Sequence, residues 1–416
     1  MIGHALEIPS DMNTAAAAPT TMREMWLISV GHMLTHWYPA TFYLLLPLIG
    51  RELDLSYTEI GLVMTVMHGV GALLSMPAGM LIDMVGRKGK LMAFSLFWIG
   101  LPYALMSVTH AYWMVLACVA LVGFGNTLWH PAAIATLSNR YPARKGLVLS
   151  LHGMGGNIGE AVAPVAVGAL LAVMSWRGVV VVNILPGLVI SVLLLLYLGA
   201  FTVENNRSTH DAARSLRDFL GDFRLLFRNR ALMLISTATG MRTLTQSGLL
   251  TFLPVYLAYE LAYSPFAVGI CMAVLQLGGF LAAPVGGHLS DRLGRRRIIM
   301  SGMFVTGITI VGMVLAAKTP LFVVFVALVG FFLYAMRPAL QAWAMDAAPQ
   351  HMGGSTVGLQ FTFSALGSAI APALCGMIAD AWSIYTAFYC LAGTIVFANV
   401  MMLLMPPENR PAPAAP

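Results

Sequence analysis

One carboxyl group stands near the middle of an apolar stretch of this chain. Most of the 17 acidic residues lie in polar segments or at the ends of apolar runs, but Glu160 lies about half-way along the run 146–174. A charge at the centre of a membrane-spanning helix costs roughly 2.5–3.5 kcal/mol, so such a group must be protonated, paired or in contact with water. A carboxyl group in a wet cavity could carry protons. The alternatives are a fixed ion pair between helices and a direct contact to a solute.

Two arginines lie inside apolar runs of the second half. Arg242 is about mid-way along its run, and Arg337 lies within another. A guanidinium group in a cavity attracts anions, and its planar fork fits a carboxylate, phosphate or phosphonate. For Arg337 the alternatives are an ion pair with Asp346 or a side chain that extends to the nearby surface. For Arg242 the deeper position favours contact to a solute or to Glu160.

Five histidines lie inside apolar runs of the first half: His32, His36, His68, His130 and His152. His32 and His36 are four residues apart and share a helical face. Histidine titrates near neutral pH, so these rings could relay protons or contact a solute. Buried rings hydrogen-bonded to a neighbouring helix are the alternative. The spacing could also ligate zinc, but the arginines would repel a metal cation and no His-Glu-x-x-His string occurs. We therefore predict no metal.

Two sets of site residues follow from these patterns and from the polar and aromatic residues of the same runs. The predicted proton-coupling groups are Glu160, His36 and His32. The predicted substrate contacts are Arg242, Arg337, His130, Trp129, Gln246, Tyr256, His68 and Gln341. Five further polar residues either line a cavity or join helices: Asn126, Asn157, Asn183, Gln276 and Gln360.

The composition requires a membrane around these groups. Of the 416 residues, 59% are hydrophobic and 10% are charged, and the mean hydropathy is +0.81. Soluble domains carry about 25% charged residues, so a water-soluble enzyme is excluded. The four cysteines lie in apolar runs without the spacing of a zinc site or a disulfide framework, so we expect buried thiols.

A membrane helix needs about 20 apolar residues, and the chain contains twelve such segments. They run over 25–49, 60–84, 89–109, 112–138, 146–174, 178–201, 231–258, 267–290, 297–317, 320–346, 354–379 and 383–405. The predicted organisation is a disordered tail (1–22), a six-helix bundle (23–201), a linker (202–230), a second six-helix bundle (231–405) and a second tail (406–416). Residues 1–22 lack the pattern of a signal peptide.

Lysine and arginine gather on one side of these segments. That side holds most of the 23 basic residues, among them Arg87, Lys88, Lys90, Arg140, Arg144, Lys145, Arg292 and Arg295 to Arg297. The opposite loops hold Arg51, Arg177 and Lys318. Because basic loops stay in the cytoplasm, both tails are predicted to be cytoplasmic. These loops also account for the sequence pI of about 9.2 without a nucleic-acid partner.

The two halves repeat each other at an offset of 208 residues. Asp83 and Asp291 occupy equivalent places in two loops of the form Gly-x-Leu-x-Asp-x-x-Gly-Arg-Lys/Arg or a near variant, and Pro164 returns as Pro372. Parallel six-helix repeats that meet at a cavity near the bilayer midplane are a recurring transporter architecture. The glycines Gly155 and Gly159 would also let another helix approach closely.

The repeated loop resembles the signature loop of the major facilitator superfamily. The resemblance implies a latch that holds the two halves together on the cytoplasmic side in the outward-facing state. The implied gating residues are Gly79, Asp83, Gly86 and Arg87 in the first copy and Gly287, Asp291, Gly294 and Arg295 in the second. Met84 replaces the basic residue usual after the aspartate, which implies a weaker first latch.

A narrower resemblance links the first half to the fosmidomycin-resistance type of efflux carriers. It is carried by His32, by Leu55 to Gly61, by Trp129-His130-Pro131 and by Gly155 to Gly159 with Ala163-Pro164. The last stretch also resembles an antiporter motif, with Ala163 in place of a glycine. The chain departs from the carriers at Ala132, where they usually have an acid, and at Glu160, where they lack one.

Together these features predict an all-α membrane protein with twelve transmembrane helices in two pseudo-symmetric six-helix bundles. The predicted function is a proton-coupled efflux antiporter that exports a small anionic or amphipathic organic compound by alternating access. A symporter that imports an organic acid uses the same groups and is the first alternative; a receptor with a transporter fold is the second. We expect no enzyme activity, no cofactor besides the proton gradient, and a monomer in the lipid bilayer of a bacterial-type inner membrane.

Overall fold

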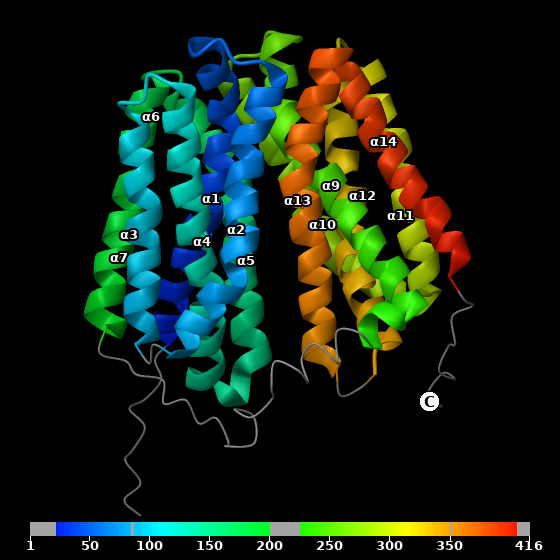
Figure 1. Cartoon of the computed structure of the whole chain (residues 1–416), viewed down its shortest axis with the longest axis horizontal. Coiled ribbons are helices and arrows are strands. Elements are labelled where there is room, and N and C mark those ends of the chain that lie inside the picture. The colour runs from blue at the N-terminus through cyan, green and yellow to red at the C-terminus, as the bar shows by residue number, and fades with distance from the viewer. Residues whose placement is uncertain (1–21, 85–86, 200–224, 350–351, 406–416) are drawn as a thin grey trace, which may run out of the picture.

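The computed structural model describes residues 22–84, 87–199, 225–349 and 352–405, with the backbone alone at 76, 79–84 and 354. These residues form helices joined by short loops (Figure 1). The first half contains α1 (Met22–Glu52), α2 (Tyr57–Met84), α3 (Lys88–Met106), α4 (Tyr112–Arg140), α5 (Lys145–Leu170), α6 (Trp176–Val182) and α7 (Ile184–Leu198). The second half contains α9 (Arg230–Tyr259), α10 (Pro265–Leu293), α11 (Arg295–Leu315), α12 (Leu321–Ala347), α13 (Gly353–Ala381) and α14 (Ile384–Met401).

Among the described residues, nine helical segments are long and apolar enough to cross a membrane, with α6 and α7 counted as one. Helices α1, α5 and α9 have 31, 26 and 30 residues and are also of spanning length. They are less apolar because they carry polar groups such as His36, Glu160 and Arg242. The twelve predicted spans are therefore confirmed, and these three carry Glu160, Arg242 and His36 of the predicted site.

The sixth span differs from its prediction as one continuous helix. It is interrupted at Asn183 between α6 and α7. Pro186 lies in the first turn of α7 and has no N–H group to donate to the carbonyl of Val182, which breaks the helical hydrogen-bond pattern. Asn183 lies at the break and accepts a hydrogen bond from the Trp37 indole at 2.6 Å, which ties this span to α1.

The cysteines are free, and three of them are buried as predicted. Cys118, Cys271 and Cys375 lie in the packed interior, whereas Cys390 is exposed on α14. The expectation of a buried thiol was wrong for Cys390, because an apolar run in a membrane protein also supplies the lipid-facing surface.

The helices pack as two bundles, α1 to α7 and α9 to α14, which lie side by side in Figure 1. In the first bundle α5 lies directly on α1. A Cβ atom built on Gly155 would lie 2.4 Å from the Ser29 carbonyl oxygen, and one on Gly159 would lie 2.2 Å from that of Met33. Only glycine permits this approach, so the small-residue face predicted on this run is the one that contacts α1.

Two helix pairs make most of the contact between the bundles, α2 with α13 and α5 with α10. The repeat extends to the atoms of these contacts. A Cβ atom on Gly61 would lie 2.1 Å from the Pro372 carbonyl oxygen, and one on Gly269 would lie 2.3 Å from that of Pro164. Gly61 and Gly269 are 208 residues apart, as are Pro164 and Pro372. The two seams are therefore pseudo-symmetric copies of one packing arrangement.

Hydrogen bonds between the bundles gather at the end of the molecule remote from the basic loops. We call the end with the basic loops the basic end and the other the opposite end. At the opposite end Arg51 donates to the Ala258 carbonyl at 2.7 Å, and Tyr259 donates to the Pro47 carbonyl at 2.9 Å. The ribbons of the bundles lie close together at this end, at the top of Figure 1. The opposite end is thus closed by direct contact.

The carboxylate of Asp380 makes a further contact there. At the last turn of α13, its two oxygens accept hydrogen bonds from the backbone N–H groups of Tyr57 and Thr58, at 2.9 and 2.7 Å. These N–H groups begin α2 and have no partner within the helix. A negative charge at a helix N-terminus is stabilising, so Asp380 caps a helix of the other bundle.

Candidate functional site

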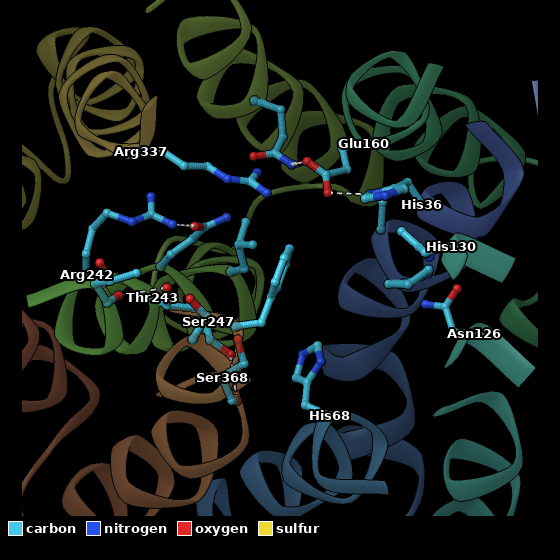
Figure 2. A pocket seen from close by; sticks show the side chains of 18 of the residues that line it. His36, His68, Asn126, His130, Glu160, Arg242, Thr243, Ser247, Arg337 and Ser368 are labelled. Atoms are coloured by element: carbon cyan, nitrogen blue, oxygen red, sulfur yellow. Dashed lines mark hydrogen bonds and ion pairs between the residues drawn. The ribbon is translucent and has the colours of Figure 1, made fainter. Parts of the chain in front are cut away.

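A cavity of about 380 Å³ lies between the two bundles. Its wall contains residues of α1, α2, α4 and α5 from the first bundle and of α9, α10, α12 and α13 from the second. Figure 2 shows polar side chains from both bundles around this cavity. The cavity is where the two halves present polar groups to each other in an otherwise apolar interior.

Glu160 of α5 is bonded to both bundles at the cavity wall. Its Oε1 atom lies 2.7 Å from His36 Nδ1 on α1, and its Oε2 atom accepts a hydrogen bond from Gln276 Nε2 on α10 at 2.9 Å. The side chains of Glu160 and His36 remain about 28% and 30% exposed. The carboxylate is therefore paired and hydrogen-bonded yet in contact with the cavity, two of the conditions under which a charge is tolerated within a membrane.

Glu160 also ends a chain of hydrogen bonds that begins at Arg242. Arg242 donates to Gln246 Oε1 at 2.7 Å, and Gln246 donates to the Tyr334 hydroxyl at 2.8 Å. Tyr334 donates to Gln276 Oε1 at 2.5 Å, and Gln276 then donates to Glu160. Every donor in this relay points toward the carboxylate. A change in the charge of Glu160 therefore alters the last acceptor of a chain that begins in the second bundle.

The two arginines differ in how much of each guanidinium is free. Arg242 is buried, and it also donates to the Leu333 carbonyl at 2.9 Å. Arg337 is exposed at the cavity wall and has no hydrogen-bond or ion-pair partner among the described residues (Figure 2). The alternative of an Arg337–Asp346 pair was wrong, because Asp346 pairs with Arg295 at 2.8 Å. Arg337 is thus the cation best placed to receive an anion.

Four histidine rings of the first bundle form a cluster beside Glu160. His36 and His130 line the cavity, and His32 lies behind them with its ring centroid 4.7 Å from that of His36 and 5.1 Å from that of His130. The His152 ring is stacked on His32 at 4.0 Å. His68 lies apart from this cluster, where its Nε2 atom is 3.2 Å from the Tyr43 hydroxyl.

Most of the predicted substrate contacts line the cavity, but two do not. Arg242, Arg337, His130, Gln246, His68 and Gln341 lie in its wall. Trp129 is fully buried, with its ring against Gly31 of α1. Tyr256 is fully buried and its ring contacts those of Phe322 and Phe388. Trp129 and Tyr256 were wrong as cavity residues, since both pack in the core. His32, predicted as a coupling group, also lies outside the wall.

A stripe of hydroxyl groups on the second bundle was not predicted. Thr239, Thr243 and Ser247 on α9 line the cavity together with Ser364 and Ser368 on α13. Each set recurs every four residues, so its members share one helical face. This spacing is visible in the sequence and could have identified the stripe. The hydroxyl groups give this wall neutral polar groups beside the arginines, and those of Thr239, Thr243 and Ser247 donate to the backbone carbonyls of Ile235, Thr239 and Ser368.

The structure describes more of the second copy of the repeated basic loop than of the first. In the second copy Arg295 donates to Asp291 at 2.7 Å and to Asp346 at 2.8 Å, which joins the ends of α10, α11 and α12. Gly294 has a φ of 99°, a conformation that favours glycine. Gly287 lies against Pro338 of α12. The second loop thus holds the second bundle together at the basic end.

In the first copy Arg87 is exposed at the start of α3. Gly86 lies outside the described residues, and only the backbone is described at Gly79 and Asp83.

Comparison with known proteins agrees with this architecture. A family model described as the Major Facilitator Superfamily matches residues 25–261 and 235–416. The fosmidomycin resistance protein of Escherichia coli is 24% identical over 97% of this chain and 98% of its own length. The phosphoglycerate transporter protein of Salmonella typhimurium is 22% identical over 94% of this chain and 90% of its own.

Among solved structures, a bacterial homologue of the human lysosomal transporter Spinster, in an inward-facing and occupied conformation, superposes with a TM-score of 0.79. It is 15% identical, and the match covers 96% of this chain and 100% of that one. At this identity the likeness establishes the fold.

Proposed function

Because the chain belongs to the major facilitator superfamily, whose members are secondary transporters, we propose that it exports a small organic anion in exchange for protons. The two bundles would rock about the cavity and expose it to each side of the membrane in turn. A relative named for phosphoglycerate transport supports an anionic solute, and a relative named for fosmidomycin resistance supports export.

The observation that carries the proposal is the position of Glu160. It is a carboxylate in contact with the cavity, and each of its oxygens is bonded to a different bundle. Protonation removes its charge and at least one of its acceptor sites. The bond to His36 or the bond to Gln276 must then weaken. A proton on Glu160 therefore changes the free energy of a contact between the two moving parts, which coupling requires.

The cationic second wall supports an anionic solute. The guanidinium of Arg337 faces the cavity without a partner among the described residues, and Arg242 adds a second positive charge behind it. A carboxylate or phosphate can accept two parallel hydrogen bonds from one guanidinium. The hydroxyl groups of Ser364 and Ser368 can donate hydrogen bonds to further oxygens of the solute.

In the exchange scheme, the relay organises the substrate wall when Glu160 is charged. The carboxylate then accepts from Gln276, which fixes Tyr334 and Gln246 and, through them, the buried Arg242. Protonation of Glu160 releases the end of this relay and loosens the wall that binds the solute. Proton and solute would thus exclude each other, and substrate affinity would fall as the pH falls.

Proton symport is the second candidate, and the charge of Arg337 favours it. Arg337 attracts the Glu160 carboxylate. When Glu160 is protonated and neutral, this attraction is lost, and the guanidinium would interact more strongly with a bound anion. Under this scheme the substrate affinity would rise as the pH falls. The two candidates use the same residues and differ in the sign of the coupling.

We place the basic end in the cytoplasm, because loops rich in lysine and arginine stay on that side. The contacts of Asp380, Arg51 and Tyr259 would then close the outer end of the cavity. In this orientation the cavity is closed toward the outside, as it is in an inward-facing conformation. The same contacts must separate when the cavity opens outward.

Proton movement in reconstituted vesicles tests the proposal. Vesicles of known protein orientation, with a pH-sensitive dye inside, would receive carboxylates, phosphate esters and phosphonates, each paired with a neutral analogue. Exchange predicts that entry of a transported anion makes the lumen more alkaline, and symport predicts acidification. Transport of an anion without a lumenal pH change would contradict proton coupling.

A further inference from the structure

The histidine cluster contains more than proton coupling at Glu160 requires. His32, His36 and His130 come from two helices, and their ring nitrogens include one atom from each residue that lie within 4.8 Å of one another. His36 alone contacts the carboxylate. The other two rings, one of them behind the cavity wall, are left without a role in the transport scheme.

Two of the three rings have one nitrogen engaged by a hydrogen-bond acceptor, and the third has a backbone carbonyl nearby. His36 Nδ1 contacts the Glu160 carboxylate, and His32 Nδ1 lies 2.7 Å from the His152 carbonyl oxygen. His130 has the backbone carbonyl of Asn126, one turn earlier in α4, as the nearby acceptor for one of its nitrogens. A neutral imidazole that donates from one nitrogen carries a lone pair on the other. The acceptors therefore fix each ring so that its second nitrogen is a ligand.

This arrangement is the one that metal-binding histidines adopt. Such residues almost always donate their second ring nitrogen to a carboxylate or a backbone carbonyl, which orients the ring and makes it a better ligand. The free Nε2 atom of His32 is buried and has no hydrogen-bond partner among the described residues. A buried polar atom without a partner is costly, so a missing ligand accounts for it.

We propose that His32, His36 and His130 form a three-histidine site for a divalent transition-metal cation such as Zn²⁺. Imidazole is a ligand for zinc, copper, nickel and iron, whereas magnesium and calcium prefer oxygen. Zinc–nitrogen bonds of about 2.0–2.1 Å in tetrahedral geometry require nitrogens about 3.4 Å apart, so the rings close by small side-chain rotations. His36 and His130 line the cavity, which leaves the fourth position open to water or to an anionic group there.

The sequence predicted no metal because the arginines would repel a cation, but the structure places a carboxylate, that of Glu160, between Arg337 of the second bundle and His36 (Figure 2). The carboxylate supplies a negative charge next to the proposed ion. In this site His36 is a metal ligand, and its bond to Glu160 orients the ring. This role of Glu160 is the same whether the chain exchanges or imports its solute.

Metal binding to the purified full-length chain tests the site. The protein would be isolated without a histidine tag and titrated with Zn²⁺ by calorimetry. We expect one tight site per chain and a loss of affinity on the order of 100-fold in His32→Gln and His130→Gln, since each variant removes a ligand. His68→Gln is the matched control, because His68 lines the same cavity outside the cluster. It should bind as the original chain does.

Two further measurements keep the result decisive if a variant folds poorly. Co²⁺ bound to the unmodified chain should show the intense visible absorption of a four-coordinate ion. Glu160→Gln should keep the stoichiometry and lose affinity by about 10- to 100-fold, as expected for a residue that contacts a ligand. Absence of stoichiometric binding, a six-coordinate Co²⁺ spectrum, or an equal loss in His68→Gln would each overturn the proposal.

Discussion

The two walls of the cavity share a backbone plan and differ in chemistry. Glu160 of the first bundle corresponds in the repeat to Ser368, and Arg337 of the second corresponds to Trp129. Acid and imidazole groups gather on one wall, and guanidinium, amide and hydroxyl groups on the other. The pseudo-symmetry thus supplies two similar halves that can move about each other, and the differences in sequence assign them different tasks. On this account the first wall carries the proton and the second binds the anion.

The largest effect is expected at Glu160. Glu160→Gln keeps the size of the side chain but cannot exchange a proton, so transport driven by a pH gradient should be abolished while exchange of labelled solute across vesicles continues. The matched control is Glu59→Gln, because Glu59 belongs to the capping box at the start of α2, where glutamine serves as well. Gradient-driven transport that persists in Glu160→Gln would assign the proton to another group.

The second effect is expected on the opposite wall. Arg337→Gln should lower the affinity for anionic solutes at least about 30-fold, since removing one partner of a desolvated charge pair costs about 2–5 kcal/mol. Binding of a neutral analogue should change little, and proton exchange at Glu160 should remain. Affinities for both ligands, measured by calorimetry, separate these outcomes. An equal loss for both ligands would show that Arg337 supports the fold instead of binding the anion.

A smaller effect is expected where the walls are joined. Tyr334→Phe removes the hydroxyl that links Gln246 to Gln276, and each lost hydrogen bond is worth about 1 kcal/mol. The number of protons moved per solute should fall, with gradient-driven transport reduced roughly tenfold. Tyr256→Phe is the control, because its hydroxyl lies in the core outside the relay. Unchanged stoichiometry in Tyr334→Phe would mean that the walls communicate by another route.

The smallest effect is expected at the opposite end, where the two seams differ. Asp380 caps α2, whereas its repeat equivalent is Ala172, and the equivalent of Tyr57 is Pro265, which has no N–H group. Asparagine keeps one acceptor oxygen but removes the negative charge at the start of α2, which costs about 0.3–1 kcal/mol. Asp380→Asn should therefore shift the equilibrium several-fold toward separation of this end.

Distances between spin labels on the α1–α2 and α9–α10 loops would measure that shift. Glu52→Gln is the matched control, because Glu52 lies at the same end and bonds Trp176 and Arg177 within the first bundle. An unchanged distance distribution in Asp380→Asn, or an equal shift in both variants, would remove Asp380 from the gate.

The fold was predictable because its signals are local. Apolar runs of sufficient length located all twelve spans, and the offset of 208 residues separated the bundles. The break at Asn183 was missed, although Pro186 in the same run signals it. Burial of Cys390 was wrong because hydropathy does not distinguish a helix face toward lipid from one toward protein.

The site was predicted most directly where a charged group interrupted an apolar run. Glu160, Arg242 and Arg337 stood out in this way, and they line the cavity. Trp129 was misplaced because neighbouring residues of a helix point about 100° apart, so His130 faces the cavity and Trp129 faces α1. The relay joins four helices, and no spacing within one segment indicates it.

Infrared spectroscopy of the Glu160 carboxyl group would test the central claim most directly. Addition of the transported anion to the purified protein should change the protonation of this group, seen as a difference band that disappears in Glu160→Gln. Loss of protonation on binding is the result that proton exchange predicts, and gain of a proton is the result for symport. A carboxyl band unaffected by the anion, or one that persists in Glu160→Gln, would contradict the assignment of the proton to the first wall.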